Sequence, residues 1–250
     1  MSSGRRSDRR VFAPAWLSLL VVAACAATPT ANPEAPAADD DAAAPANELA
    51  WIDLFDGRTL GAFVVTDYGG QGEVAVRDGR LHLGIGNPLT GVTWTGAPPR
   101  GDYELELVAR RDQGNDFFAS LTFPVGDACL TLVLGGWGGS LCGLSSLDGL
   151  DASRNGTRTS RAFPTGRDAH VQLVVTADAV HVDLDGAPLL RTDLRGRRLS
   201  LRPEVELSRP LGLIAFASEG SIARLRWRPR SGDAADRRDA AATSADPSRR

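Results

Sequence analysis

The sequence predicts an all-β protein folded as a two-sheet jelly-roll sandwich, and three observations carry this prediction. Short runs in which apolar and polar residues alternate, such as 102–111, fill the middle of the chain, and a period of two is that of a strand with one buried face. Asp-Gly pairs at 78–79 and 185–186 separate such runs, where a two-residue hairpin turn fits. From Leu49 onward, no amphipathic pattern is long enough for an ordinary helix.

The expected strand boundaries follow from these alternating runs and from the turn residues between them. We expect strands at 50–55, 62–66, 73–77, 80–85, 91–95, 102–111, 116–124, 128–134, 140–144, 158–163, 169–176, 179–184, 187–191, 211–217 and 221–228. Many short strands at near-regular spacing are typical of two packed sheets, because a single open sheet of this width is unusual. An up-and-down barrel is the alternative architecture.

Length and composition limit how the chain is organised. With 250 residues, 42% of them hydrophobic, the chain can bury one sizeable core, which we assign to a single domain at 49–230. The net charge of −3 comes from mixed charges without a basic face. This distribution argues against nucleic acid as a partner.

Residues 1–25 have the pattern of a bacterial export signal. A basic start precedes an apolar run from Ala15 to Ala24, which is about half the length that spans a bilayer. Val22-Ala23-Ala24-Cys25 resembles a lipobox, so Cys25 is expected to carry lipid and to anchor the exported protein to a membrane, on its periplasmic or cell-surface face. A plain cleavable signal is the alternative, and Arg9-Arg10 leaves the twin-arginine route open. Equal detergent-phase partition of the wild type and Cys25→Ser would contradict the lipid anchor.

The segments on either side of the domain contain almost no large apolar residues. Residues 26–48 are rich in Ala, Pro and Asp, and residues 231–250 are rich in Ala, Asp, Arg and Ser. Such segments bury too little apolar surface to offset the entropy of ordering. The first is therefore expected to be a solvated linker and the second a disordered tail.

Histidine and cysteine spacing argues against a zinc site and against a serine hydrolase. No histidine pair has metal-ligand spacing, and neither a Cys-x-x-Cys nor a Gly-x-Ser-x-Gly motif occurs. His82 and His181 each alternate with aliphatic residues, so both are expected to point away from the core, toward solvent or a binding surface. His170 precedes a strand and has the same two interpretations.

Four segments together resemble a known family. LFDGRTLGAF (54–63), EVAVRDGRLHLG (73–84), GDYELELVARR (101–111) and PLGLIAFASEGSIARLRWR (210–228) are similar to successive signatures of the 3-keto-disaccharide hydrolase family. The likeness extends from Trp51 to Arg230 and implies a concanavalin A-like, or laminin G-like, jelly roll. Where the family usually carries Asn-Ser-Gly and Glu-x-Gln motifs, this chain reads GNDFFASLTFPVGD and CLTLVLGGWGG. The chain thus resembles a divergent member.

The resemblance implies hydrolysis of an oxidised (3-keto) glycoside by elimination and hydration. A ketone at C3 makes the C2 proton acidic, so a base can remove this proton while the C1 leaving group departs, and water then adds back. Under this hypothesis Asp116, Asp148 and Asp151 supply base and acid, or ligate a calcium ion. Arg154 and Asn155 would then polarise the ketone oxygen. Turn capping is the alternative role of each aspartate.

Two glycine-flanked aromatic loops indicate a carbohydrate site. Trp137 lies between Gly135-Gly136 and Gly138-Gly139, and an indole on such a loop suits stacking on a sugar ring. A tryptophan that closes one end of the sandwich is the alternative. Asp67 and Tyr68 precede Gly69-Gly70 in a second loop of this kind. The sequence thus leaves three hypotheses: an enzyme acting on an oxidised disaccharide, a non-catalytic carbohydrate-binding lipoprotein, and a structural scaffold.

Cys129 and Cys142 flank the Trp137 loop, so the hairpin register decides whether they can form a disulfide. A tight turn on Gly135-Gly136 places the two cysteines opposite each other, within bridging distance. A five-residue loop at 135–139 places Cys142 opposite Leu132 and keeps the thiols apart. We favour the longer loop, because it leaves Trp137 free at the tip and pairs apolar residues with one another.

Overall fold

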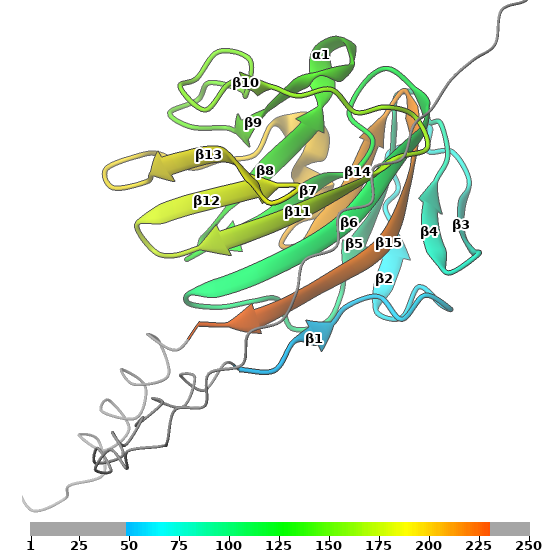
Figure 1. The fold of residues 1–250 in the computed structure, drawn as a ribbon, viewed down its shortest axis with the longest axis horizontal. Helices are drawn as coiled ribbons and strands as arrows, with labels where there is room; N and C mark the ends of the chain where they lie inside the picture. Colours follow the sequence, from blue (N-terminus) through cyan, green and yellow to red (C-terminus); the bar gives the residue numbers. More distant parts are fainter. Residues whose placement is uncertain (1–48, 231–250) are drawn as a thin grey trace, which may run out of the picture. The chain divides into compact units, whose positions relative to one another are not determined.

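The computed structural model describes residues 49–230, which form two antiparallel β-sheets packed face to face (Figure 1). The expected export signal with Cys25, the linker at 26–48 and the tail at 231–250 lie outside the described residues. Within residues 49–230, no helix is long and apolar enough to cross a membrane. The two separate sheets confirm the predicted sandwich and exclude the up-and-down barrel.

The first sheet has eight strands in the order β13-β12-β11-β6-β15-β4-β3, with β1 paired to β15. Its strands are β1 (Ile52–Asp53), β3 (Val74–Arg77), β4 (Arg80–Leu83), β6 (Tyr103–Gly114), β11 (Asp168–Val175), β12 (Ala179–Leu184), β13 (Ala187–Asp193) and β15 (Ser218–Pro229). The long strands β6 and β15 lie side by side at its centre.

The second sheet has seven strands in the order β10-β9-β8-β7-β14-β5-β2. Its strands are β2 (Phe63–Val65), β5 (Leu89–Trp94), β7 (Ser120–Val125), β8 (Ala128–Gly135), β9 (Leu141–Ser145), β10 (Thr159–Ser160) and β14 (Gly212–Phe216). Each strand expected from the sequence therefore has a counterpart. The sequence did not predict two short elements, the α1 turn (Gly136–Gly139) and the 3-10 helix η1 (Pro203–Ser208).

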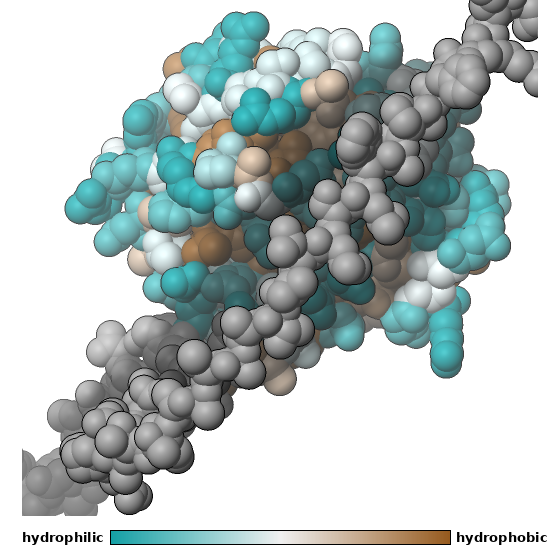
Figure 2. Space-filling model, in the orientation of Figure 1, coloured by the Kyte–Doolittle hydropathy of each residue, from teal (hydrophilic) through white to brown (hydrophobic). Residues whose placement is uncertain are grey.

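The hydrophobic core lies between the two sheets. Along β6, Tyr103, Leu105 and Leu107 point into this layer and are almost fully buried, because alternate strand residues share one face. In the space-filling view, apolar residues gather in the middle of the face and hydrophilic residues cover its periphery (Figure 2). Burial of each such leucine contributes about 1.5–3 kcal/mol, so the alternating runs that predicted the strands also supply the main packing energy.

The β8–β9 hairpin has neither of the two registers considered from the sequence. Leu134 lies opposite Cys142, and Thr131 lies opposite Ser145. Cys142 therefore points into the core, whereas Cys129 packs on the other face of the sheet with Leu201 and Val205. Both expected pairings of Cys142 were wrong, but the separation of the thiols and the exposed Trp137 of the longer loop are confirmed.

We expect both thiols to remain free in the native protein. The cysteines lie on opposite faces of one sheet, and burial raises the pKa of Cys142 to about 11, which keeps its thiol protonated. Alkylation after denaturation without reductant, followed by peptide mass spectrometry, should label both Cys129 and Cys142. A peptide pair linked through these residues would contradict the observed register.

Candidate functional site

A cavity of about 270 Å³ lies on the outer face of the seven-stranded sheet, close to the lower end of the volumes of small-molecule sites, roughly 300–1,000 Å³. Its floor is formed by side chains whose strand neighbours point into the core. Ser120 on β7, Thr131 and Val133 on β8, and Ser145 on β9 alternate with buried leucines. The floor thus offers three hydroxyl groups and one apolar group.

The walls of this cavity include three aromatic side chains and come from segments distant in sequence. Phe117 precedes β7 and packs against Phe216 at the end of β14, with 5.4 Å between the ring centroids. Trp137 comes from the α1 turn, and Arg202 and Glu204 come from the start of η1. Together these residues make a concave surface with an apolar wall and a polar rim.

Trp137 is exposed at the tip of the β8–β9 hairpin, as the sugar-site hypothesis requires. Its side chain is 45% exposed, and its own φ is +46°. The glycines around it allow this turn, because Gly135 and Gly138 also have positive φ. Trp137 also borders a second hollow of about 530 Å³ that extends toward β10. The indole thus stands between two open spaces and does not close the end of the sandwich.

Arg111 holds the Trp137 turn from inside the protein. Its Nη2 donates hydrogen bonds to the carbonyl oxygens of Gly135 at 3.2 Å and Gly139 at 2.9 Å, one at each end of the turn. The same nitrogen donates to the carbonyl of Asp116 at 3.2 Å, and Nη1 donates to that of Phe163 at 3.3 Å. The side chain is buried, with only 6% of the residue exposed. Arg111 therefore links the first sheet to two parts of the cavity wall.

The sequence interpretation did not single out Arg111, although a signal was present. Position 111 continues the inward series of Tyr103, Leu105, Leu107 and Ala109 along β6. A charged residue in that series must be buried, and a buried charge needs partners. A guanidinium has five N–H donors and can satisfy several carbonyl groups at once.

Asp116 is the one predicted catalytic residue that lines the 270 Å³ cavity beside Trp137, called the Trp137 cavity from here on. Its Oδ1 accepts a hydrogen bond from the N–H of Phe117 at 2.8 Å. Its own N–H donates to Ser218 Oγ at 2.8 Å, and its carbonyl accepts from Arg111. The backbone of Asp116 is thus fixed on both sides, and its carboxylate borders the same space as the indole.

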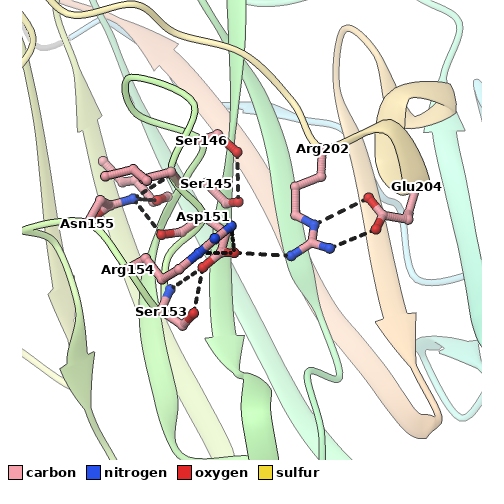
Figure 3. A network of polar contacts seen from close by, with 10 residues as sticks. Ser145, Ser146, Asp151, Ser153, Arg154, Asn155, Arg202 and Glu204 are labelled. Atoms are coloured by element: carbon pink, nitrogen blue, oxygen red, sulfur yellow. Dashed lines mark hydrogen bonds and ion pairs between the residues drawn. The ribbon is translucent and has the colours of Figure 1, made fainter.

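Asp151 belongs to a neighbouring polar network, in which Arg202 donates hydrogen bonds to both Asp151 and Glu204 (Figure 3). Its Oδ1 accepts from Ser153 Oγ at 2.6 Å, and its Oδ2 forms an ion pair with Arg154 at 2.8 Å. Burial acts to raise the pKa of Asp151, but the bonds from Ser153 and Arg154 outweigh it and lower the pKa. The carboxylate is therefore ionised and engaged, beside a separate hollow of about 240 Å³.

Asn155 and Asp148 both stabilise the loop that follows β9. The Asn155 amide donates to the carbonyls of Leu144 and Leu150, and its Oδ1 accepts from Thr157 Oγ1 at 2.6 Å. Asp148 is exposed, and its hydrogen bond from Arg197 lowers its pKa. Asp148 lines none of the three hollows described above. The structure thus places the three predicted catalytic aspartates in three different surroundings.

The second aromatic loop lies apart from the Trp137 cavity. Asp67 caps its own turn by accepting a hydrogen bond from the N–H of Gly69 at 3.1 Å. Tyr68 packs against a buried cluster that contains Leu89 and Ile214, and burial raises the pKa of its hydroxyl to about 12. Neither residue lines the cavity. Tyr68 instead packs within the apolar cluster whose member Leu89 lines the cavity.

His82 does not face solvent or the Trp137 cavity, contrary to the expectation from its strand pattern. It points away from the core, as predicted, but it lies on the outer face of the eight-stranded sheet and is only 7% exposed. Arg77 and Arg110 form ion pairs with Glu219 and Asp112, the two acidic residues that lie 3.9 Å from His82 Nδ1. The alternation along this one strand cannot predict the burial of His82.

Comparisons with known proteins identify the fold. No protein-family model and no curated protein match the chain. Among solved structures, the carbohydrate recognition domain of Emp47p is 13% identical, with a TM-score of 0.50 over 74% of this chain and 99% of that one. The Crh5 transglycosylase, solved both free and in complex with NAG, is 15% identical, with a TM-score of 0.51 over 74% of this chain and 85% of that one. At these identities the likeness establishes the architecture alone: the chain has the concanavalin A-like jelly-roll fold.

Proposed function

We propose that the protein binds carbohydrate in the cavity on the outer face of the seven-stranded sheet. One observation carries this proposal: an exposed indole stands beside a cavity whose floor offers hydroxyl groups and whose wall is aromatic. The structural neighbours named as a carbohydrate recognition domain and a transglycosylase share the architecture, which makes a sugar ligand consistent with the fold.

The two faces of a sugar ring match the two kinds of surface in this cavity. The C–H groups of a pyranose can stack on the Trp137 indole, because an aromatic ring face attracts the positive edge of such groups. Its hydroxyl groups can exchange hydrogen bonds with Ser120, Thr131 and Ser145 on the floor. At the rim, Arg202 and Glu204 offer a charged donor and acceptor that remain reachable from solvent.

Replacement of Trp137 by alanine should weaken binding of a glycan identified in an array screen by roughly 1–3 kcal/mol, about 5- to 150-fold in Kd. The melting temperature should hardly change, because the side chain is 45% exposed. The control is Ile85→Ala, which removes an equally exposed apolar side chain outside the cavity. Titration calorimetry and thermal melts measure both quantities. A large loss of stability with unaltered binding would return Trp137 to a structural role.

A second candidate function is the elimination and hydration of a 3-keto glycoside, which the resemblance to 3-keto-disaccharide hydrolases implies. The observation that favours it is the Asp116 carboxylate on the wall of the Trp137 cavity. A sugar stacked on the indole would bring its ring hydrogens toward this side of the cavity. Asp116 is then the base that removes the C2 proton.

If this second function holds, Asp116→Asn should lower kcat on a 3-keto disaccharide by about 10²- to 10⁴-fold, the range for loss of a general base. Binding of the same sugar should change little, since the amide keeps the shape of the side chain. Asp127→Asn, in the exposed turn between β7 and β8, is the matched control. Absence of turnover by the wild type, with binding intact, would leave a non-catalytic binding protein.

A further inference from the structure

Three potential metal ligands meet on the outer face of the eight-stranded sheet. His82 on β4, Glu219 on β15 and Asp112 on β6 come from three adjacent strands. Their ligand atoms all lie within 4.8 Å of one another. The Trp137 cavity lies on the outer face of the other sheet, so this cluster is separate from the proposed sugar site.

Asp112 lies at a β-bulge of β6. Gln113 pairs with Glu219 and Arg111 pairs with Gly220, so Asp112 is an extra residue on β6 with no partner on β15. Such bulges bend a strand and change the direction of a side chain, and they are common beside functional sites.

The distances in the cluster are too long for hydrogen bonds and close to those around a metal ion. His82 Nδ1 lies 3.9 Å from Asp112 Oδ2 and 3.9 Å from Glu219 Oε1. Two ligand atoms bound to one zinc ion at about 2.1 Å each are about 3.4–3.6 Å apart. A movement of a few tenths of an ångström by each carboxylate would bring these two distances to that value.

The unsatisfied polar atoms of the cluster point independently to a missing partner. His82 is 7% exposed, and neither of its ring nitrogens has a hydrogen-bond partner. Asp112 Oδ2 is also buried without a partner. Each buried polar atom left without a partner costs about 1–3 kcal/mol. A bound cation would satisfy Nδ1 and Oδ2 together.

The two arginines beside the cluster leave its ligand atoms accessible to an ion. Arg110 Nε donates to Asp112 Oδ1 at 2.6 Å, which orients the carboxylate and leaves Oδ2 for the ion. Arg77 contacts Glu219 Oε1 at 3.3 Å from an exposed position and can move aside.

We propose that His82, Asp112 and Glu219 bind a divalent transition-metal ion of the zinc class, which links the three adjacent strands β6, β15 and β4 of the eight-stranded sheet. One imidazole nitrogen and two carboxylate oxygens suit such an ion, with water in a fourth position. Calcium is a poor fit, because it prefers six to eight oxygen ligands. The ion stabilises the fold, since it binds only where the three strands are assembled.

The test uses the full-length protein, treated with a chelator, dialysed, and titrated with Zn²⁺ or Ca²⁺ in separate experiments. We expect one Zn²⁺ per chain, a rise in melting temperature with Zn²⁺, and no comparable effect of Ca²⁺. Asp112→Asn and Glu219→Gln keep the side-chain shapes and should each weaken Zn²⁺ binding by about 10- to 100-fold or more. His181→Gln, which alters an exposed histidine on β12, should leave Zn²⁺ binding unchanged.

Several outcomes would overturn the proposal. These are no Zn²⁺ uptake at micromolar concentrations by the folded wild type, uptake that survives both carboxylate substitutions, and uptake that is lost with His181→Gln. Equal affinity for Ca²⁺ would refute the assignment to a transition metal. If one carboxylate variant fails to fold, the other variant decides, together with the histidine ¹⁵N spectrum of the wild type, in which Zn²⁺ should shift Nδ1 of His82.

Discussion

The Arg111→Met variant should lose about 3–5 kcal/mol of folding stability, the range for disrupting a buried charged network. Methionine fills similar space, but it cannot donate to the carbonyls of Gly135, Gly139, Asp116 and Phe163 that the guanidinium now satisfies. Loss of the charge also removes the contact with the Phe118 ring, which lies 5.2 Å from the guanidinium carbon. The turn that carries Trp137 should therefore loosen as the fold weakens.

Urea unfolding measures the loss of stability, and amide hydrogen exchange at 135–139 measures the loosening of the turn. The control is Arg224→Met, which removes an exposed arginine paired with Glu106 and should cost no more than about 1 kcal/mol. Equal losses in the two variants would show that the buried carbonyl contacts contribute little. Faster exchange confined to 135–139 would support the role of Arg111 in positioning the indole.

The Gly220→Ala variant should be destabilised by about 3 kcal/mol, at the upper end of the range for overpacking. A Cβ at this position would lie 1.9 Å from the carbonyl oxygen of Phe118 and 2.8 Å from its carbonyl carbon. Both are backbone atoms and cannot rotate away. Relief would require the segment that carries Phe117 and Phe118 to move, so the cavity wall should shift as well.

Gly156→Ala is the matched control for this glycine substitution. A Cβ at Gly156 would meet no heavy atom within 4 Å, and its φ is not in the left-handed region. This variant should therefore be as stable as the wild type, or more stable by about 0.4–1 kcal/mol through lower entropy of the unfolded chain. Thermal and urea unfolding of the two variants provide the comparison. If Gly220→Ala proved as stable as Gly156→Ala, the close approach of β15 to Phe118 would be refuted.

Several strands of the eight-stranded sheet could be predicted because their burial is one-sided. Along β6 and β11, alternate residues enter a single core, so apolar residues recur in the sequence with the same period of two as side chains along a strand. The register of the β8–β9 hairpin could not be predicted in the same way. Gly136 forms a bridge to Leu141, while Leu134 pairs with Cys142, so the connection contains an irregularity. Glycines with positive φ allow this irregularity, and the alternation of apolar and polar residues does not indicate where it lies.

The candidate site was predictable only where a single residue carried the signal. Trp137 stood out because four glycines flank it, and the structure shows it exposed at a cavity. The hydroxyl floor could have been found from the outward positions of β7 and β8, since Ser120 and Thr131 interrupt otherwise apolar runs. Arg202 and Glu204 could not have been found from the sequence, because the start of η1 reaches the cavity only in the folded protein.

The same limit applies to the metal cluster. His82, Asp112 and Glu219 are far apart in the sequence and converge only through the strand order β6-β15-β4. No short sequence motif contains these three residues, so no metal-ligand spacing could be recognised. Their convergence is a property of the topology, so only the assembled sheet could reveal it.

Chemical-shift mapping of a bound sugar on the isotope-labelled protein tests the central claim most directly. A glycan identified in an array screen is titrated, and the amides that shift are assigned. We predict that the largest shifts fall on the α1 turn around Trp137 and on Ser120, Thr131 and Ser145, which line one cavity. Failure of every glycan in the screen to bind, or shifts confined to the outer face of the eight-stranded sheet, would contradict a carbohydrate site on the seven-stranded sheet.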